Sequence, residues 1–366
     1  MAPQHKIAMS PDAGSARVVI SVDAMGGDHG PAAVVAGLVI SARALPDVDF
    51  ILHGDQAQLN PILAKSPELS GRVTLRHAPR AVTMADKPAA IMRSGSDTSM
   101  WGAVTSVRDG EAAVAVSCGN TGALMAVSML RLRKLAGVNR PAIACFWPSR
   151  NASGFNIMLD VGADIKADAQ DLRQYAVMGA AYGAVGLGLA VPRVGLLNVG
   201  TEEHKGRAEL HEAHDLLAQD AAGQFDFIGF VEGSDIPSNR VDVIVTDGFT
   251  GNIALKTGEG TAKLIGDFMR ESFTRNLTSK LAALLSMGVL RHLRRRIDPR
   301  RANGGVFLGL NGTVVKSHGG SDAVAFASAI ALAHRLSRGA FLARLASRVS
   351  TGQTAPASGG EAGASV

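Results

Sequence analysis

Four times along this 366-residue chain, an apolar run passes through a glycine-bearing turn into a helical pattern. In the first case, Val18–Val22 are typical of a buried strand, and Pro31 suits the first turn of a helix that we expect over Ala32–Leu45. The same change occurs within residues 112–130, 194–217 and 241–269. Strands that alternate with helices form βαβ units, so the pattern predicts an α/β fold with a mainly parallel sheet and flanking helices.

The glycine-bearing turns are candidates for ligand binding. Sheets of this kind bind ligands beyond the carboxyl ends of their strands, so we expect the four turns to lie along one edge and to meet around one ligand. Gly26, Gly27 and Gly30 allow a sharp turn, and the free N–H groups at a helix start favour an anion such as phosphate. A turn of this kind can equally be a simple connection, and this stretch alone does not choose between the two.

Nucleotide-binding motifs are weak or absent. No stretch supplies a Walker A loop, which excludes nucleotide hydrolysis by that route. Residues 26–30 read G-G-x-x-G rather than G-x-G-x-x-G, although Asp55 follows near the place of a ribose-binding acid. An NAD(P)-dependent dehydrogenase therefore stays open as the alternative function.

The sequence gives little support for a metal site or for a nucleophilic cysteine. Asp23, Asp28 and His29 offer only two carboxylates and one imidazole on a single turn, so we predict no metal site. Cys118 at a helix start could be an acyl-accepting nucleophile, but a small residue packed beneath a tight turn is the simpler interpretation.

Composition bounds the class of protein. A hydrophobic content of 46% and a mean hydropathy of +0.15 suit a soluble chain, and no window of about 18 apolar residues offers a membrane span. Two cysteines and the lack of a secretory signal favour a cytoplasmic location. We expect residues 17–349 to form one α/β domain between disordered tails at 1–16 and 350–366.

Nucleic-acid binding is not expected. The net charge is +5, yet only 4% of the residues are aromatic and the sequence contains no recognition module for nucleic acid.

Several ordered motifs resemble one known family. They are "VDAMGGDHGP", "GNTGALMA", "LDVGA", "NVGTEEHKG", "TDGFTGN" with "LK" and "EG" behind it, and "KSHGGSD". In this order they resemble the acyl-carrier-protein:phosphate acyltransferases of bacterial phospholipid synthesis. The resemblance implies transfer of a long-chain acyl group from acyl carrier protein to inorganic phosphate. It also implies a homodimer, a Rossmann-like fold similar to isocitrate dehydrogenases and phosphotransacetylases, no cofactor, and a membrane glycerol-3-phosphate acyltransferase that receives the acyl phosphate.

The resemblance also points to site residues. Lys205 in "TEEHKG" can neutralise phosphate or polarise the carbonyl, and Asn252 in "DGFTGN" can donate to the developing oxyanion. The residues expected to line the anion pocket are Gly26, Gly27, Asn120, Thr121 and Thr250. The carboxylates expected to orient donors or cap helices are Asp23, Asp28, Glu202 and Asp247. One departure is that Ser94, Gly95 and Ser96 stand where the family usually carries a basic run.

The segment before the dense basic cluster at residues 291–301 has its own pattern. Apolar side chains recur every four residues from Ile265 to Leu285, and Gly288 interrupts before a second short stripe. This predicts a protruding hairpin of two amphipathic helices at about residues 270–300, packed on the core or a dimer partner in its half before Leu277. The residues expected to contact anionic lipid headgroups or the acidic carrier protein are Leu281, Leu284, Leu285, Leu290, Leu293, Arg291, Arg294, Arg295 and Arg296.

Overall fold

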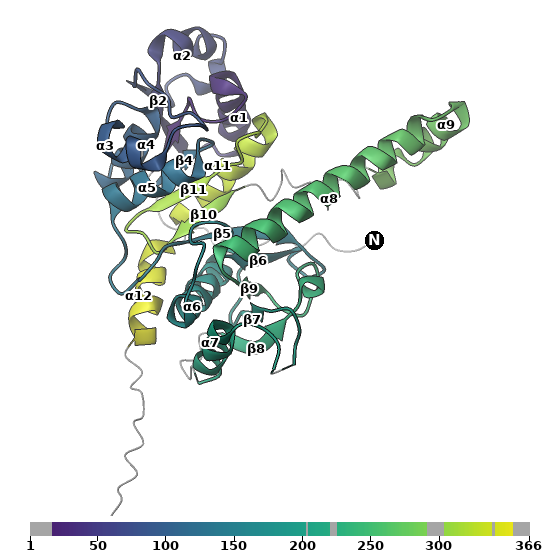
Figure 1. Ribbon diagram of the computed structural model, residues 1–366. Coiled ribbons are helices and arrows are strands. Elements are labelled where there is room, and N and C mark those ends of the chain that lie inside the picture. Colours follow the sequence, from purple (N-terminus) through teal and green to yellow (C-terminus); the bar gives the residue numbers. More distant parts are fainter. Residues whose placement is uncertain (1–16, 203, 220–224, 291–303, 339–340, 354–366) are drawn as a thin grey trace, which may run out of the picture.

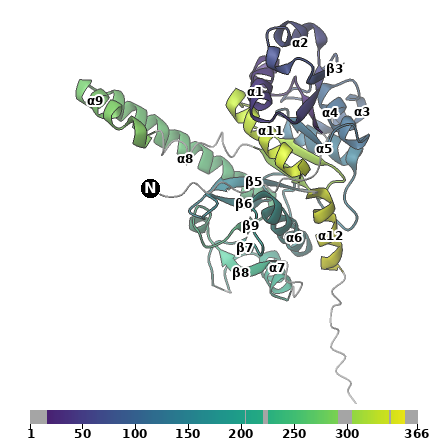
Figure 2. The same cartoon turned by 180° about the vertical axis from the view of Figure 1, so that it is seen from behind.

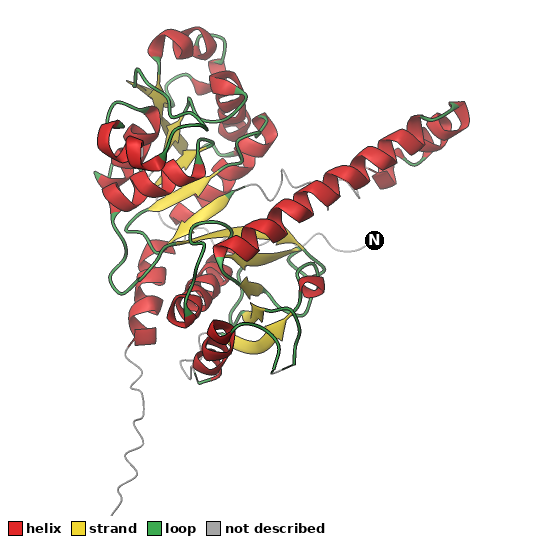
Figure 3. Ribbon diagram, viewed as in Figure 1, coloured by secondary structure: helices red, strands yellow, loops and turns green. Residues whose placement is uncertain are grey.

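The computed structural model of the chain describes residues 17–202, 204–219, 225–290, 304–338 and 341–353. Its core is one 11-stranded sheet in the order β3-β2-β1-β4-β11-β10-β5-β6-β9-β7-β8. The sheet runs through the molecule between its helices (Figure 3), and one long helix projects from the body (Figure 1). Seven of the strand pairings are parallel and three are antiparallel, so the predicted α/β fold with a mainly parallel sheet is confirmed.

The N-terminal half of the sheet consists of parallel strands with helices in the connections. Its strands are β1 (Val18–Asp23), β2 (Val48–Gly54), β3 (Val73–His77) and β4 (Val114–Ser117). Its helices are α1 (Gly30–Ala44), α2 (Gln56–Leu63), α3 (Pro88–Ser94), α4 (Ser99–Arg108) and α5 (Thr121–Leu132), with a short 3₁₀ turn at Pro67–Leu69. As predicted, Pro31 lies in the first turn of α1.

The second half follows along the chain. Its strands are β5 (Ala142–Pro148), β6 (Phe155–Leu159), β7 (Arg193–Leu197), β8 (Asp226–Val231) and β9 (Val243–Val245). Its helices are α6 (Ala169–Gly186) and α7 (Ala208–Ala218), with a 3₁₀ turn at Gly233–Asp235. Beyond β9, the projecting arm consists of α8 (Gly248–Thr274) and α9 (Leu277–Leu285).

The C-terminal segment returns to the middle of the sheet. It consists of β10 (Gly305–Leu308), β11 (Thr313–Lys316), α11 (Ala323–Arg338) and α12 (Phe341–Gln353). β11 pairs with β4, and β10 pairs with β5, so this segment joins the two halves. Figure 2 shows α11 in front of the sheet, running from α1 toward α12. Because α12 extends to Gln353, residues 350–353 are helical, which corrects the predicted start of the C-terminal tail.

Three antiparallel pairings reverse the strand direction across the middle of the sheet. β10 runs antiparallel to both β11 and β5, and β5 runs antiparallel to β6. Strands β6, β9 and β7 therefore run opposite to β1 and β4. The expectation that all four glycine-bearing turns share one edge of the sheet is wrong for this reason.

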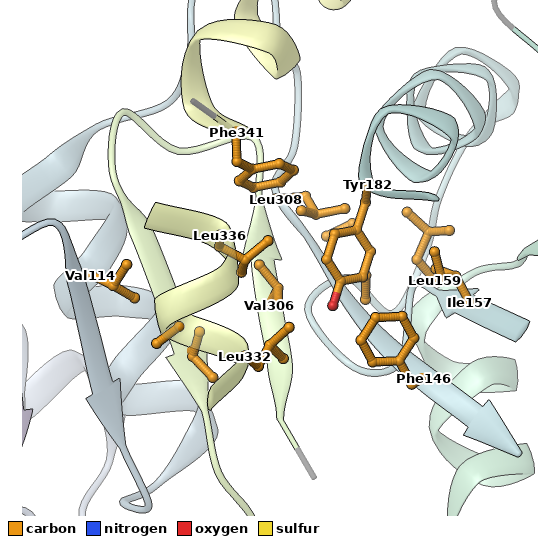
Figure 4. Close-up of a cluster of buried hydrophobic side chains, with 14 of the residues drawn as sticks. Val114, Phe146, Ile157, Leu159, Tyr182, Val306, Leu308, Leu332, Leu336 and Phe341 are labelled. Carbon is orange, nitrogen blue, oxygen red and sulfur yellow. The ribbon is translucent and has the colours of Figure 1, made fainter. Parts of the chain in front are cut away.

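Both faces of the sheet are covered. On one face, the apolar residues of α1, α6, α7, α11 and α12 form a continuous core, part of which is drawn in Figure 4 with Phe146, Tyr182, Leu332 and Phe341 among its members. On the other face, α4, α5 and the start of α8 cover a second core. β5 contributes to both, because Ala144 and Phe146 face the first core while Ile143 and Cys145 face the second.

The arm differs in detail from the predicted hairpin. α8 continues to Thr274, and the break lies at Arg275–Asn276, where the Asn276 side chain accepts a hydrogen bond from the Ser279 N–H and so caps α9. Gly288, the predicted break, lies within a helical run at residues 287–290. Within the described residues, no helix is both long enough and apolar enough to span a bilayer.

Candidate functional site

A cleft of about 520 Å³ lies between α8, the central strands and the segment that follows β11. Figure 1 shows α8 leaving the body beside β5 and β6. Residues from both halves of the sheet line the cleft: Thr121, Ile143, Cys145, Phe146, Trp147, Pro148, Val161, Gly162, Asn252, Leu255, Lys256, Gly258, Glu259, Ala262, Gly304, Gly305, Lys316 and His318. The reversal of strand direction thus still allows turns from both halves to meet at one cavity.

The start of α8 is fixed by a cap and by two close contacts. The buried Asp247 carboxylate accepts hydrogen bonds from the Thr250 N–H at 2.8 Å and hydroxyl at 2.9 Å, and it pairs with Arg207. A Cβ on Gly251 would lie 1.9 Å from the Asp160 carbonyl oxygen, and one on Gly248 would lie 2.4 Å from Asp160 Oδ2. Only glycine lets the helix approach this closely, which explains both glycines of "DGFTGN".

Asp160 orders the turn that faces α8. Its carboxylate accepts hydrogen bonds from the N–H groups of Ile143 at 2.8 Å, Ala163 at 2.9 Å and Asp164 at 2.7 Å. Burial raises the pKa of Asp160 to about 6, although these hydrogen bonds lower it. The ordered turn places Gly162 in the lining of the cleft beside Asn252.

Asn252 lies in the second turn of α8, in the lining of the cleft. Its side chain is exposed, and no hydrogen bond to its amide occurs among the residues that the structure describes. The amide N–H groups are therefore available to a ligand in the cleft, as the predicted role of Asn252 requires.

One helical turn further along α8, a cluster of charged side chains lines the same cleft. Lys256 Nζ lies 2.7 Å from Glu259 Oε2 and 3.3 Å from His318 Nε2. Burial and the nearby Lys256 ammonium lower the pKa of His318, which favours the neutral form of its imidazole. The cluster joins the arm to the segment after β11.

Lys316 supplies a second, buried ammonium group. It is 9% exposed, and its Nζ donates hydrogen bonds to the carbonyl oxygens of Cys118, at 3.3 Å, and Ser317. Burial, helped by the nearby Lys256 ammonium, lowers the pKa of Lys316 to about 8. The two lysines outnumber the one carboxylate of the lining, Glu259, and with the Asn252 amide they favour an anionic ligand.

Of the five residues expected to line an anion pocket, Thr121 lines this cleft. Asn120 caps α5 by accepting from the Ala123 N–H, and its amide donates to the carbonyl oxygens of Met84 and Asp86. The Thr250 hydroxyl is bonded to Asp247. The side chains of Asn120 and Thr250 therefore hold the walls of the site in place.

Gly26 and Gly27 lie in a separate, smaller hollow with Cys118 and Gly319. A Cβ on Gly26 would lie 2.6 Å from the Gly119 nitrogen, and Gly27 has a positive φ of 93°. The close approach of neighbouring loops explains these glycines. Cys118 is buried beneath them, and burial raises the pKa of its thiol to about 11, which supports the packing interpretation over a nucleophile.

Asp23 and Asp28 of the first glycine-rich turn differ, because only the Asp23 carboxylate is buried, whereas Asp28 is exposed. Asp23 is buried, accepts a hydrogen bond from the Ser117 hydroxyl at 2.7 Å, and has a pKa raised by burial. The Asp28 N–H donates to the Gly319 carbonyl oxygen. No group of three or more His, Cys, Asp or Glu side chains suited to a metal ion occurs in the described part of the chain.

Lys205 lies on the loop after β7, outside the lining of the cleft. Its Nζ pairs with Glu202 Oε1 at 2.7 Å, and this contact raises the pKa of Lys205. The loop lies next to the start of α8, because Arg207, two residues further on, pairs with Asp247. Asn252 and Thr121 therefore line the same cleft, whereas Lys205 lies on a neighbouring loop outside it.

Ser94–Ser96, where the basic run was expected, end α3. The carbonyl oxygen of Ser94 accepts a hydrogen bond from Arg80, and the Ser94 hydroxyl donates to the Ala90 carbonyl oxygen at 3.2 Å. Gly95 follows as the C-cap. These residues do not line the cleft.

The arm presents apolar residues to solvent. The exposed fractions of Leu281, Leu284 and Leu285 are 57%, 60% and 80%. Ile265 and Phe268 in the half before Leu277 are also exposed, so that half does not pack on the core of its own chain. Leu290 ends the described segment and is half-buried, whereas Leu293, Arg291, Arg294, Arg295 and Arg296 lie outside the described residues.

Comparison with known proteins shows which fold and which family this chain matches. A phosphotransacetylase from Streptococcus pyogenes has the same fold, with a TM-score of 0.56 and 17% identity over 87% of this chain and 94% of that chain. Fold and cleft together define an α/β protein with a phosphotransacetylase-like sheet and a cationic cleft at its centre. The chain belongs to the family described as fatty acid synthesis protein, whose sequence model matches residues 18–344.

Two relatives with high sequence identity carry the same name. A phosphate acyltransferase from Cereibacter sphaeroides strain KD131 is 68% identical over 94% of both chains. A phosphate acyltransferase from Dinoroseobacter shibae is 65% identical over 95% of this chain and 91% of the relative. The resemblance seen in the sequence motifs and the expected enzyme class are confirmed, and these relatives favour acyl transfer over the dehydrogenase alternative.

The charged cluster was missed as a site in the sequence. Lys256 and Glu259 are the "LK" and "EG" behind "TDGFTGN", and Lys316 and His318 belong to "KSHGGSD". These motifs carried the resemblance, but residue spacing gave no reason to bring them together. The sequence feature that could have identified them as site residues is a charged side chain inside a glycine-rich motif, close to the end of a strand or the start of a helix.

Proposed function

We propose that this protein transfers a long-chain fatty acyl group from acyl carrier protein to inorganic phosphate, by direct attack of phosphate on the thioester. The observation that carries the proposal is the cleft, which combines the Asn252 amide and the ammonium groups of Lys256 and Lys316 with an apolar side. Such a cavity suits a substrate pair of one anion and one aliphatic thioester.

The proposed reaction needs positioning more than chemical assistance. A phosphate oxygen bonds to the thioester carbonyl carbon, and the C–S bond of the resulting tetrahedral oxyanion breaks to release a thiolate. The lysines balance the charge of phosphate, and the Asn252 amide donates to the oxyanion. No acyl-enzyme is required, in keeping with the raised pKa of the Cys118 thiol.

Lys205 is proposed as the second key side chain. Its partner Glu202 is about half exposed, and exposed ion pairs contribute little to stability. A phosphate dianion near the start of α8 can therefore compete with Glu202 for the Lys205 ammonium. Binding would then bring Lys205 from its present position toward the cleft.

The proposal extends to partners and location. We propose a cytoplasmic homodimer that acts at the inner face of the membrane, where a membrane glycerol-3-phosphate acyltransferase consumes the acyl phosphate. The exposed leucines of α9 support this, because apolar residues on a projecting helix suit insertion between lipid headgroups. The basic residues 291–301 are proposed to contact anionic lipid or the acidic carrier protein.

The direct test is incubation with palmitoyl-acyl carrier protein and labelled phosphate. We expect label to appear in acyl phosphate, trapped by hydroxylamine as the hydroxamate, at a rate that follows protein concentration. A protein that forms no acyl phosphate but changes NADH fluorescence would favour the dehydrogenase alternative instead.

A further inference from the structure

One side of the cleft is apolar and is formed by two elements. On β5, Cys145 and Trp147 lie on the side of the second core, whereas Ala144 and Phe146 pack in the first core, although Phe146 also contributes to the lining of the cleft. On α8, three residues share one helical face, because they are separated by three and four positions. We call the resulting set the apolar wall: Cys145, Trp147, Leu255, Gly258 and Ala262.

Contact between the two elements closes this side. A Cβ on Gly258 would lie 2.3 Å from Cη2 of the Trp147 ring, so the indole lies directly against the backbone of α8. Burial raises the pKa of the Cys145 thiol to about 12, which leaves it neutral and effectively apolar. The apolar wall therefore contains no charged side chain.

Charged groups occupy other positions of the same cleft. Lys256 and Glu259 form an ion pair on α8, Lys316 lies at the end of β11, and His318 lies in the segment that follows. Asn252 lies ten residues before Ala262, a distance of about 15 Å along the helix axis. The cleft is therefore long enough to hold a polar head near Asn252 and an apolar tail toward Ala262.

We propose that the apolar wall binds the aliphatic chain of the acyl donor, and that Ala262 limits the length of chain the cleft accepts. The identity of the ligand as a fatty acyl group rests on the proposed function. Ala262 is the last α8 residue of the lining and is small and half-buried, so a larger side chain there would fill the distal end. Each methylene group that the wall buries strengthens binding about fourfold.

The first test compares Ala262→Phe with Thr261→Phe, its exposed neighbour outside the lining. With palmitoyl-acyl carrier protein, we expect Ala262→Phe to lower kcat/KM at least tenfold. With an octanoyl donor it should stay within about twofold of the wild type, and the KM for phosphate should not change. Thr261→Phe should keep the wild-type profile. Equal losses with both donors, or an unchanged profile in Ala262→Phe, would overturn the role of Ala262.

The second test does not depend on catalysis. The chain has two tryptophans, and Trp101, on α4 against the Arg131 guanidinium, lies outside the cleft, so Trp101→Phe leaves Trp147 as the reporter. We expect palmitate to change the Trp147 emission saturably, and Ala262→Phe to weaken this binding at least tenfold while Thr261→Phe does not.

The two tests distinguish failure of the apolar wall from failure of the proposed acyl transfer. Palmitate binding at Trp147 in a protein that forms no acyl phosphate would support the apolar wall and defeat the proposed function. An active enzyme whose Trp147 emission ignores palmitate, while equilibrium dialysis detects bound palmitate, would defeat the apolar wall alone. Absence of palmitate binding by both measurements would also defeat it.

Discussion

Lys205 and Asn252 are the residues on which the proposed chemistry depends most directly. Lys205 is exposed and Asn252 has an exposed amide, so replacing either with Ala removes no core contact. Loss of one donor to the transition state typically lowers kcat about 100-fold. We expect this loss in Lys205→Ala and Asn252→Ala, with melting temperatures near the wild type.

The matched control for this pair is Glu202→Gln. It removes the negative charge that pairs with Lys205 but keeps the ammonium, so its turnover should stay within a few-fold of the wild type. Cys118→Ser should also remain active. Wild-type turnover in a well-folded Lys205→Ala would remove that lysine from the mechanism, and inactivity of Cys118→Ser would revive an acyl-enzyme.

The lowered pKa of Lys316 predicts that phosphate binding depends on pH. Because burial lowers its pKa to about 8, the ammonium is present at lower pH and is lost as the pH rises through that value. The cleft then loses one positive charge, so the KM for phosphate should rise between about pH 7 and pH 9. In Lys316→Met, the KM should be high already at pH 7 and rise less steeply. A parallel rise in both proteins would assign the effect to another group.

At the scale of elements, the contact between α8 and the Asp160 turn controls the cleft. A Cβ at Gly251 would overlap the Asp160 carbonyl oxygen, so Gly251→Ala must displace the helix. We expect it to lower the free energy of unfolding by about 1–3 kcal/mol, measured by urea denaturation, and to reduce activity.

Gly266 offers the control within the same helix. A Cβ there meets nothing within 4 Å, so Gly266→Ala should raise stability by up to about 1 kcal/mol through helix propensity alone. Similar effects of the two substitutions would mean that α8 is not anchored through Gly251.

The arm gives a second prediction at this scale. Replacing Leu281, Leu284 and Leu285 with Glu removes apolar insertion and adds repulsion from anionic headgroups, at little cost to a core that these residues do not enter. We expect the wild type to float with anionic vesicles and the triple variant to stay behind, with equal melting temperatures. A triple variant that aggregates would instead indicate that the leucines are buried between subunits.

At the scale of the whole molecule, the sequence predicted the parallel segments and missed the reversal. β1, β4, β7 and β9 each lead through a glycine-bearing turn into a helix, and that local pattern was enough to find them. Strands β10 and β11 are only four residues each, and nothing local indicates that they pair with β5 and β4. The directions of the two halves depend on these pairings.

The site was predictable to the same extent. Asn252 and Thr121 were predicted from motifs with a recognisable pattern, and the structure places both in the lining of the candidate cleft. Lys256 and His318 are 62 positions apart, and their contact exists only because β11 ends beside α8. Residue spacing alone cannot indicate a contact that the sheet order creates.

The insertion of β10 and β11 into the centre of the sheet has a consequence for biosynthesis. β4 pairs with β11 about 200 residues later, so its edge has no partner until almost the entire chain has left the ribosome. Throughout that interval the nascent N-terminal half exposes an unpaired strand edge rich in valine and alanine, which is a template for aggregation. Production of this protein should therefore depend on chaperone capacity more than on the stability of the finished fold, and premature termination before residue 305 should give insoluble fragments.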